Sequence, residues 1–244
     1  MQYLFTNGKI YTADARDSIC EAMLIENEHI IATGSHAEIA PQASDHAKTI
    51  DLQGQFVTPG LIDAHMHLVL GGLYLNAVQL GDVASPEAFK ERIAAYAREQ
   101  EPGSWIRFGA WDHENWGGPL PHRSWIDEVT PDNPVWVTRL DGHTGLANSL
   151  ALKKAGITAH TPVPEGGAIE KDETGSLSGI IRDNAMQLIE QHMPPITDAD
   201  REAGLQKATE YLHSLGITSV HHMNIFEDSD LEFLDNMHEA GKLH

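Results

Sequence analysis

The sequence feature that most constrains the fold is a short, largely apolar segment from Leu61 to His67, which reads L-I-D-A-H-M-H. Pro59-Gly60 precedes this segment, and its apolar residues predict a short buried strand. Side chains alternate between the two faces of a strand, so Asp63, His65 and His67 are expected on one face. Two imidazoles on one rigid face can bind a metal ion, because neutral imidazole is the commonest metal ligand.

Other interpretations of these three residues stay open. The chain contains 15 histidines, so a His-x-His pair can arise by chance and consist of exposed or hydrogen-bonded side chains. Asp63 can orient one of the two histidines through a hydrogen bond. It can also be a buried structural carboxylate that accepts hydrogen bonds from backbone donors.

The composition argues against several classes of protein. With 244 residues, of which 41% are hydrophobic, the chain can form a sizeable core. A net charge of -20 argues against a nucleic-acid partner and against binding to an anionic membrane surface. The single cysteine, Cys20, excludes an internal disulfide and a Cys-x-x-Cys metal site. No segment has the pattern of a membrane span or a secretion signal, so we expect a cytoplasmic protein.

The first 58 residues consist of short strand-like segments around three turn dipeptides. These dipeptides are Asn7-Gly8, Asn27-Glu28 and Gln53-Gly54. Asparagine and glycine tolerate a positive φ, which suits tight hairpin turns. We therefore expect three hairpins in a small all-β unit with a structural role.

Helical and strand patterns follow the histidine pair. Ser85 and Thr197 stand where helix caps are expected, each directly before an amphipathic segment. A hairpin is expected around Asp172 to Gly175. Apolar segments predict further strands at residues 105–111, 134–140 and 217–223.

Three stretches of the chain carry a family resemblance. They read T-P-G-L-I-D-A-H-M-H, W-D-H-E-N-W and P-V-W-V-T-R-L-D-G-H-T-G-L-A-N-S-L-A-L-K-K-A-G-I. Together they resemble the metal-dependent amidohydrolase superfamily, in particular its amidohydrolase 3 or YtcJ-like branch, over nearly the whole chain. Two positions depart from that branch: Ala110 stands where glycine is usual, and His222 stands where an acidic residue is common.

The resemblance implies an α/β fold, namely the (β/α)₈ TIM barrel of the amidohydrolases, here incomplete. A small N-terminal β-sandwich portion is expected at residues 1–58. The first part of the barrel is expected at residues 59–244, with an inserted β-hairpin near residues 166–182. Only about four of the eight strands of a complete barrel are expected. We therefore expect a fragment of a longer chain, a subunit completed by another copy or another chain, or only part of the molecule.

The resemblance also implies a function. It is the hydrolysis of a non-peptide C–N bond in a small amide-like substrate, such as an N-substituted amide or formamide. His65 and His67 are then the ligands of a divalent metal, with zinc as the first expectation, and the metal supplies an activated water. The general base of the family lies beyond residue 244, so no catalytic residue is assigned here.

Three residues are candidates for substrate contact because they lie at the ends of predicted strands, where barrels place their active sites. They are Trp111, Asp112 and His143. The alternatives are that Trp111 is an ordinary packing residue and that His143 only hydrogen-bonds its own loop. Adjacent residues of a strand face opposite ways, so at most one of His221 and His222 can point into a barrel.

Two other functions remain open on the sequence alone. One is a non-catalytic binding or assembly protein that keeps the amidohydrolase scaffold, because a fold does not determine a function. The other is a hydrolase of C–O or phosphoester bonds on the same scaffold.

Overall fold

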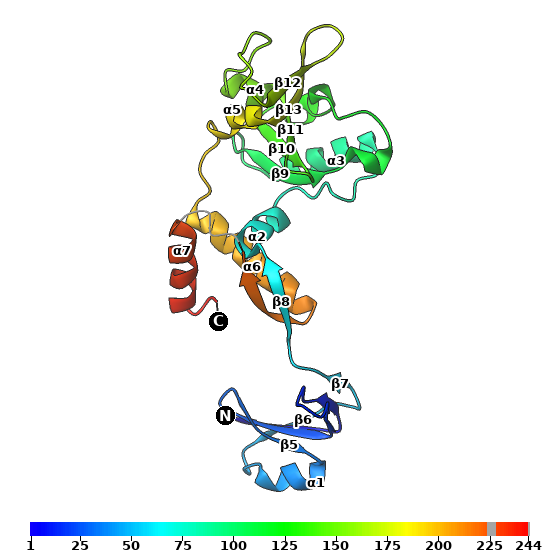
Figure 1. The fold of residues 1–244 in the computed structure, drawn as a ribbon, viewed down its shortest axis with the longest axis vertical. Coiled ribbons are helices and arrows are strands. Elements are labelled where there is room, and N and C mark those ends of the chain that lie inside the picture. Colours follow the sequence, from blue (N-terminus) through cyan, green and yellow to red (C-terminus); the bar gives the residue numbers. More distant parts are fainter. Residues whose placement is uncertain (224–227, 244) are drawn as a thin grey trace. The chain divides into compact units, whose positions relative to one another are not determined.

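A computed structural model describes residues 1–223 and 228–243, and the chain divides into two compact units (Figure 1). The first unit comprises Met1–Asp63 and Gly216–Ser219, and the second comprises Ala64–Leu215 and Val220–His244. None of the helices in the described residues combines the length and the apolar character needed to cross a membrane.

Two small sheets build the first unit. One has the strand order β5-β4-β1-β6 and the other has the order β3-β2-β7. Leu4, Ala22, Leu24 and Ile39 form a buried cluster in this unit. The elements are β1 (Gln2–Thr6), β2 (Lys9–Tyr11), β3 (Ile19–Cys20), β4 (Ala22–Glu26), β5 (His29–Gly34), α1 (His36–Ile39), a 3₁₀ turn (Ala40–Gln42), β6 (Lys48–Asp51) and β7 (Phe56–Val57).

One of the three expected hairpins is confirmed, and two are wrong. β4 and β5 pair antiparallel around Asn27-Glu28, whose φ angles of 47° and 76° lie in the left-handed region. Asn7 also has a positive φ of 54°, but β1 pairs with β4 and β6, whereas β2 pairs with β3 and β7. The strands around Gln53-Gly54, β6 and β7, likewise lie in different sheets. A turn dipeptide fixes a local bend but not the partner of each strand.

The strand that carries the histidine pair, β8 (Leu61–Met66), pairs with β14 (Ile217–His222). The Leu61 amide donates to the Gly216 carbonyl at 2.8 Å, and the Met223 amide donates to the Met66 carbonyl at 2.8 Å. The bonds advance in the same direction along both strands, which therefore run parallel (Figure 1). The expectation that β8 is buried is wrong, because Leu61 is 56% exposed and the sheet has only two strands.

The expectation of about four barrel strands is also wrong for the described residues. The segments at residues 105–111 and 134–140 form β9 and β10, which do not pair with β8 or β14. They belong to a separate five-stranded sheet with the order β12-β13-β11-β10-β9, and no closed barrel is present in the described residues. β12 and β13 form the expected hairpin and pair antiparallel.

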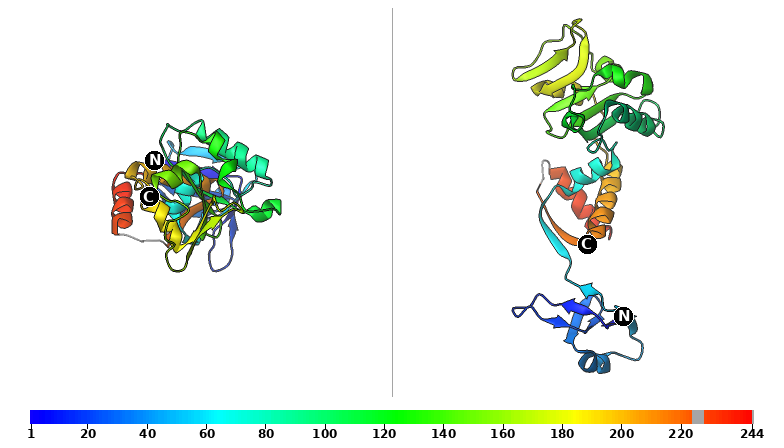
Figure 2. Two further views of the ribbon diagram at one scale, coloured as in Figure 1. Left: turned by 90° about the horizontal axis from the view of Figure 1, so that it is seen from above. Right: turned by 90° about the vertical axis from the view of Figure 1, so that its right-hand side faces the viewer.

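Helices and short 3₁₀ turns accompany the five-stranded sheet, as Figures 1 and 2 show. Its main buried cluster includes Phe89, Ile93 and Ile106. The elements of the second unit besides β8 and β14 are α2 (Leu68–Asn76), α3 (Pro86–Ala97), β9 (Ile106–Trp111), β10 (Val135–Arg139), β11 (Thr144–Ala147), α4 (Ser149–Lys154), β12 (Gly167–Lys171), β13 (Leu177–Asp183), α5 (Gln187–Glu190), α6 (Asp198–Ser214) and α7 (Asp228–Glu239). The 3₁₀ turns cover His113–Trp116, Arg123–Trp125, Asp127–Val129 and Asn184–Met186.

Local signals explain where two of these helices begin. The Ser85 hydroxyl accepts a hydrogen bond from the Ala88 amide at 3.1 Å and caps α3, as expected. Thr197 and Asp200 form a reciprocal capping box at the start of α6. Both caps satisfy backbone N–H groups that a helix terminus leaves unpaired.

Two glycines allow α2 and α6 to pack closely. A Cβ atom placed on Gly72 would lie 2.1 Å from the Gly204 carbonyl oxygen, and one on Gly204 would lie 3.0 Å from the Gly72 carbonyl carbon. The backbones therefore meet where neither residue has a side chain. Since α2 follows β8 and α6 precedes β14, this contact joins the helices that flank the parallel strand pair.

A left-handed stretch interrupts β9. Phe108, Gly109 and Ala110 have φ angles of 70°, 105° and 51°. The pairing of β9 with β10 shifts register at this point, between Val137 and Arg139. Such backbone is costly for residues with a Cβ atom, so Ala110 adopts a conformation that glycine would adopt with less strain.

Replacing Ala110 with glycine is expected to stabilise the protein by about 1 kcal/mol, because glycine adopts a positive φ without a steric penalty. The measurement is the free energy of unfolding from denaturant titration. The matched control is Gly109→Ala, which places a Cβ atom 2.9 Å from Leu80 Cδ1 at a φ of 105° and should destabilise the protein. Equal stability of the wild type and Ala110→Gly would show that the left-handed turn carries no strain.

Candidate metal and substrate site

His65 and His67 lie together at the C-terminal end of β8. Their ring centroids are 5.6 Å apart, and the ring planes meet at 80°. The alternation of a strand brings them to one side, as expected, although β8 ends at Met66 and His67 is the residue that precedes α2. His65 is exposed, and His67 is half-buried.

The imidazole nitrogens of this pair suit a metal ion, but two side chains alone do not complete a metal site. His67 Nδ1 is buried and has no hydrogen-bond partner in the described residues. A buried imidazole nitrogen without a partner is costly, whereas a lone pair on such a nitrogen can bind a cation. Residues 1–223 and 228–243 contain no group of three or more His, Cys, Asp or Glu side chains arranged to hold a metal. A metal ion held by this pair would therefore need further ligands.

A third histidine, His222, lies beside the start of α2. Its Nδ1 atom accepts a hydrogen bond from the Leu68 backbone N–H at 3.1 Å. Leu68 is the first residue of α2, so this bond satisfies one of the N–H groups that the helix leaves unpaired. His222 thereby ties the end of β14 to the residue that directly follows His67.

This hydrogen bond determines the tautomer of His222. A nitrogen that accepts a hydrogen bond carries no proton, so the neutral ring carries its proton on Nε2. Nε2 is buried and has no partner among the described residues. The ring therefore offers an N–H donor rather than a metal ligand. The neighbouring His221 is exposed.

His143 lies in the loop between β10 and β11 and is 76% exposed. Its Nδ1 atom lies 3.2 Å from Asp183 Oδ1, and its backbone N–H donates to Asp141 Oδ1 at 2.9 Å. His143 and Asp183 line an open cavity of about 440 Å³ together with Gly142 and Glu190.

Asp112 is linked to the loop of His143 through Arg139. Arg139 forms ion pairs with Asp112 at 3.3 Å and with Asp141 at 3.0 Å. A hydrogen bond from the Glu114 amide, followed by the interaction with Arg139, holds the pKa of Asp112 below its usual value. Asp112 is therefore ionised at neutral pH and holds the guanidinium between the two loops.

Trp111 occupies a different environment from the other two substrate candidates. Its side chain is fully buried in the main cluster of the five-stranded sheet, and its Nε1 donates to the Val137 carbonyl at 2.9 Å. These are the contacts of a packing residue, as in the alternative interpretation. In this structure the ring offers no surface to a ligand.

An apolar cavity continues from the one beside His143. It has a volume of about 410 Å³ and shares Gly142, Met186 and Glu190 with the first cavity. Tyr74 and Phe108 contribute aromatic rings to its wall. A concave apolar surface with few polar groups is the usual character of a small-molecule site.

The comparisons with known sequences converge on one family. The model of the amidohydrolase family matches residues 48–244. The chain is 40% identical over 217 residues to Protein LONG AFTER FAR-RED 3 of Arabidopsis thaliana, covering 89% of this chain and 37% of that protein. It is 34% identical over 217 residues to N-substituted formamide deformylase of Arthrobacter pascens, covering 86% and 39%. It is 29% identical over 223 residues to amidohydrolase YtcJ of Bacillus subtilis, covering 91% and 42%.

Solved structures give a similar result. A metal-dependent hydrolase from Pyrococcus furiosus superposes with a TM-score of 0.72 at 29% sequence identity, covering 100% of this chain and 48% of that protein. A metal-dependent hydrolase from Pyrococcus horikoshii superposes with the same TM-score at 25% identity, covering 100% and 47%. The chain therefore spans less than half the length of each of these relatives.

Removing the acceptor at His222 should weaken the start of α2. His222→Leu leaves the buried Leu68 N–H unpaired and is expected to lower the free energy of unfolding by about 1–2 kcal/mol. His222→Asn places an amide oxygen near the position of Nδ1 and should recover most of that loss. Denaturant titration measures both values.

The tautomer provides an independent readout for the same residue. Nitrogen-15 NMR of the imidazoles should show His222 with a protonated Nε2 and a bare Nδ1. A His222 ring protonated only on Nδ1, or equal losses of stability in His222→Leu and His222→Asn, would contradict this assignment.

Proposed function

We propose a function from the premise that this chain belongs to the amidohydrolase superfamily and to its YtcJ-like branch. In this proposal the chain carries part of the active site of a metal-dependent hydrolase that cleaves a non-peptide C–N bond. The observation that carries this proposal is the convergence of His65 and His67 at the end of β8, where the buried Nδ1 atom of His67 lacks a partner among the described residues. The family match over residues 48–244 supports a hydrolase.

In this proposal His65 and His67 hold a divalent metal, and zinc suits two imidazole ligands. The bound metal supplies a water of lowered pKa and polarises the scissile carbonyl. The chain itself keeps the histidine pair in place, because β8 is paired along its length and His222 anchors the first turn of α2. No described residue is assigned as the general base.

We propose an N-substituted amide or formamide as the substrate class. The support is the 34% identity to an enzyme whose name describes the deformylation of N-substituted formamides. His143 and Asp112 are proposed to lie on the substrate side, since Arg139 links their loops and His143 lines the open cavity that adjoins the apolar one. Trp111 is buried in the core directly before Asp112. We propose a cytoplasmic location, which suits the free thiol of Cys20.

A second candidate function is binding or assembly without catalysis. One observation favours it: the 40% identical relative from Arabidopsis thaliana bears a name that states no catalytic activity. This candidate requires neither a bound metal nor hydrolysis.

Metal binding separates the two candidates. Zinc titration followed by calorimetry is expected to show one site, and His65→Ala or His67→Ala should each weaken binding by about tenfold or more, because each removes one of two imidazole ligands. The control is His160→Ala, which removes an exposed histidine from a different loop. Equal zinc binding by all three variants and the wild type would exclude a site at the pair.

Hydrolysis provides the second test. The protein whose active site this chain helps to form should release formate from N-substituted formamides, lose this activity in a chelator, and regain it on addition of zinc. Carboxylic and phosphate ester substrates serve as the comparison set. Zinc bound at the histidine pair without hydrolysis of any substrate in the panel would favour the binding function.

A further inference from the structure

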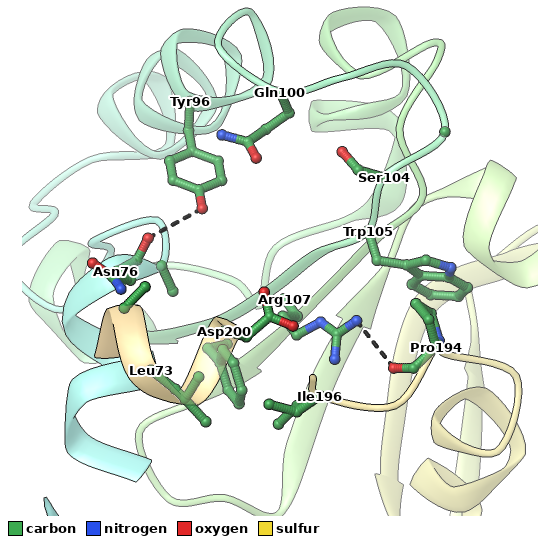
Figure 3. A pocket seen from close by; sticks show the side chains of 14 residues that line it. Leu73, Asn76, Tyr96, Gln100, Ser104, Trp105, Arg107, Pro194, Ile196 and Asp200 are labelled. Atoms are coloured by element: carbon green, nitrogen blue, oxygen red, sulfur yellow. Dashed lines mark hydrogen bonds between the residues drawn. The ribbon is translucent and has the colours of Figure 1, made fainter. Parts of the chain in front are cut away.

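A further cavity lies beside the pairing of α2 and α6 (Figure 3), and it shares Arg107, Phe108, Pro194 and Ile196 with the apolar cavity described above. Its volume is about 370 Å³, which suits a small organic molecule. The wall comes from α2, the C-terminal end of α3, the start of β9 and the start of α6. The residues that matter below are Leu73, Gln100, Trp105, Arg107, Ile196 and Asp200.

Two opposite charges line this cavity without forming an ion pair. Arg107 Nη2 donates to the Pro194 carbonyl at 3.2 Å. Asp200 Oδ2 accepts from the Thr197 amide at 2.9 Å and from the Thr197 hydroxyl at 2.7 Å. Among the ion pairs of the described residues, none within 4 Å joins Arg107 to Asp200. Each charge is therefore held by a neighbour of its own.

These anchors keep the two charges apart. Asp200 cannot swing freely toward Arg107, because it closes the capping box that begins α6. Arg107 is fixed in turn by the chain segment that leads into α6. The Arg107 guanidinium uses one N–H group for its hydrogen bond to the Pro194 carbonyl (Figure 3). Its other N–H groups remain available to a ligand in the cavity. Preorganised charges of this kind bind a complementary ligand without first breaking a mutual ion pair.

The protonation states agree with this description. Burial lowers the pKa of Arg107, and the charge of Asp200 opposes that effect. The hydrogen bonds from Thr197 lower the pKa of Asp200. An arginine side chain stays protonated at neutral pH, and a carboxyl of lowered pKa stays ionised. Both side chains are therefore charged under physiological conditions.

The rest of the wall is mixed in character. Leu73 and Ile196 present aliphatic side chains, and Trp105 presents an indole ring (Figure 3). The side-chain amide of Gln100 makes no hydrogen bond within the described part of the chain and adds a neutral polar group. An apolar group of a ligand can therefore pack beside the charged pair.

We propose that this cavity binds a small zwitterion with an apolar side chain, namely an apolar α-amino acid, whose carboxylate contacts Arg107 and whose ammonium group lies toward Asp200. A simple anion would be attracted by Arg107 but repelled by Asp200. A simple cation would be attracted by Asp200 but repelled by Arg107. A ligand with both charges satisfies both side chains. The site goes beyond the hydrolysis proposed above, because it uses neither the histidine pair nor a metal.

The test is calorimetric titration of the metal-free protein with L-leucine. We expect saturable binding, and we expect N-acetyl-L-leucine and L-leucine amide to bind at least about tenfold more weakly, since each lacks one of the two charges. Binding of all three compounds with equal affinity would overturn the proposal. Absence of detectable L-leucine binding would also overturn it.

Matched variants locate the site. Arg107→Gln removes the positive charge. Asp200→Asn removes the negative charge but keeps a side-chain oxygen that can accept the hydrogen bonds from Thr197. Each should weaken L-leucine binding by about tenfold or more. The control is Arg98→Gln, which removes an exposed arginine near the end of α3 that does not line the cavity. Unchanged binding in folded Asp200→Asn, or an equal loss in Arg98→Gln, would contradict the assignment.

Discussion

The second unit depends on one close contact, the meeting of the α2 and α6 backbones at Gly72 and Gly204. Any side chain at Gly72 would collide with the Gly204 carbonyl. The contact matters because α2 continues from β8 and α6 continues into β14, so the separation of the helices suits the pairing of the strands. At the C-terminal ends of the two strands, the hydrogen bond from the Leu68 amide to His222 Nδ1 joins the start of α2 to the end of β14.

The polar groups around the candidate site form two separate systems. One consists of the three histidines at the ends of β8 and β14, and it offers buried imidazole nitrogens. The other runs through Asp112, Arg139 and Asp141 to the loop of His143 and is mostly ionic. Within the first system the paired imidazoles of His65 and His67 suit a cation, whereas His222 holds the start of α2; the second system is a scaffold that fixes a loop beside an apolar cavity.

Local features of the fold could be predicted from the sequence, whereas pairings between distant segments could not. The alternation of a strand brings His65 and His67 together, and the caps at Ser85 and Thr197 depend only on nearby residues. The hairpin expected at Asn7-Gly8 failed because the partners of β1 lie in β4 and β6. Similarly, β9 and β10 have the pattern of barrel strands, but nothing local shows which sheet they join. The role of His222 rests on a contact with a residue 154 positions away.

The capping box of α6 has a mechanical consequence. Asp200 lies in the first turn of this helix of 17 residues and also lines the charged cavity, while the other end of the helix leads into the strand that bears His222. A helix of that length is a stiff rod of about 25 Å. One rigid element therefore joins the charged cavity to the strand that bears His222, and it contacts α2 at Gly204.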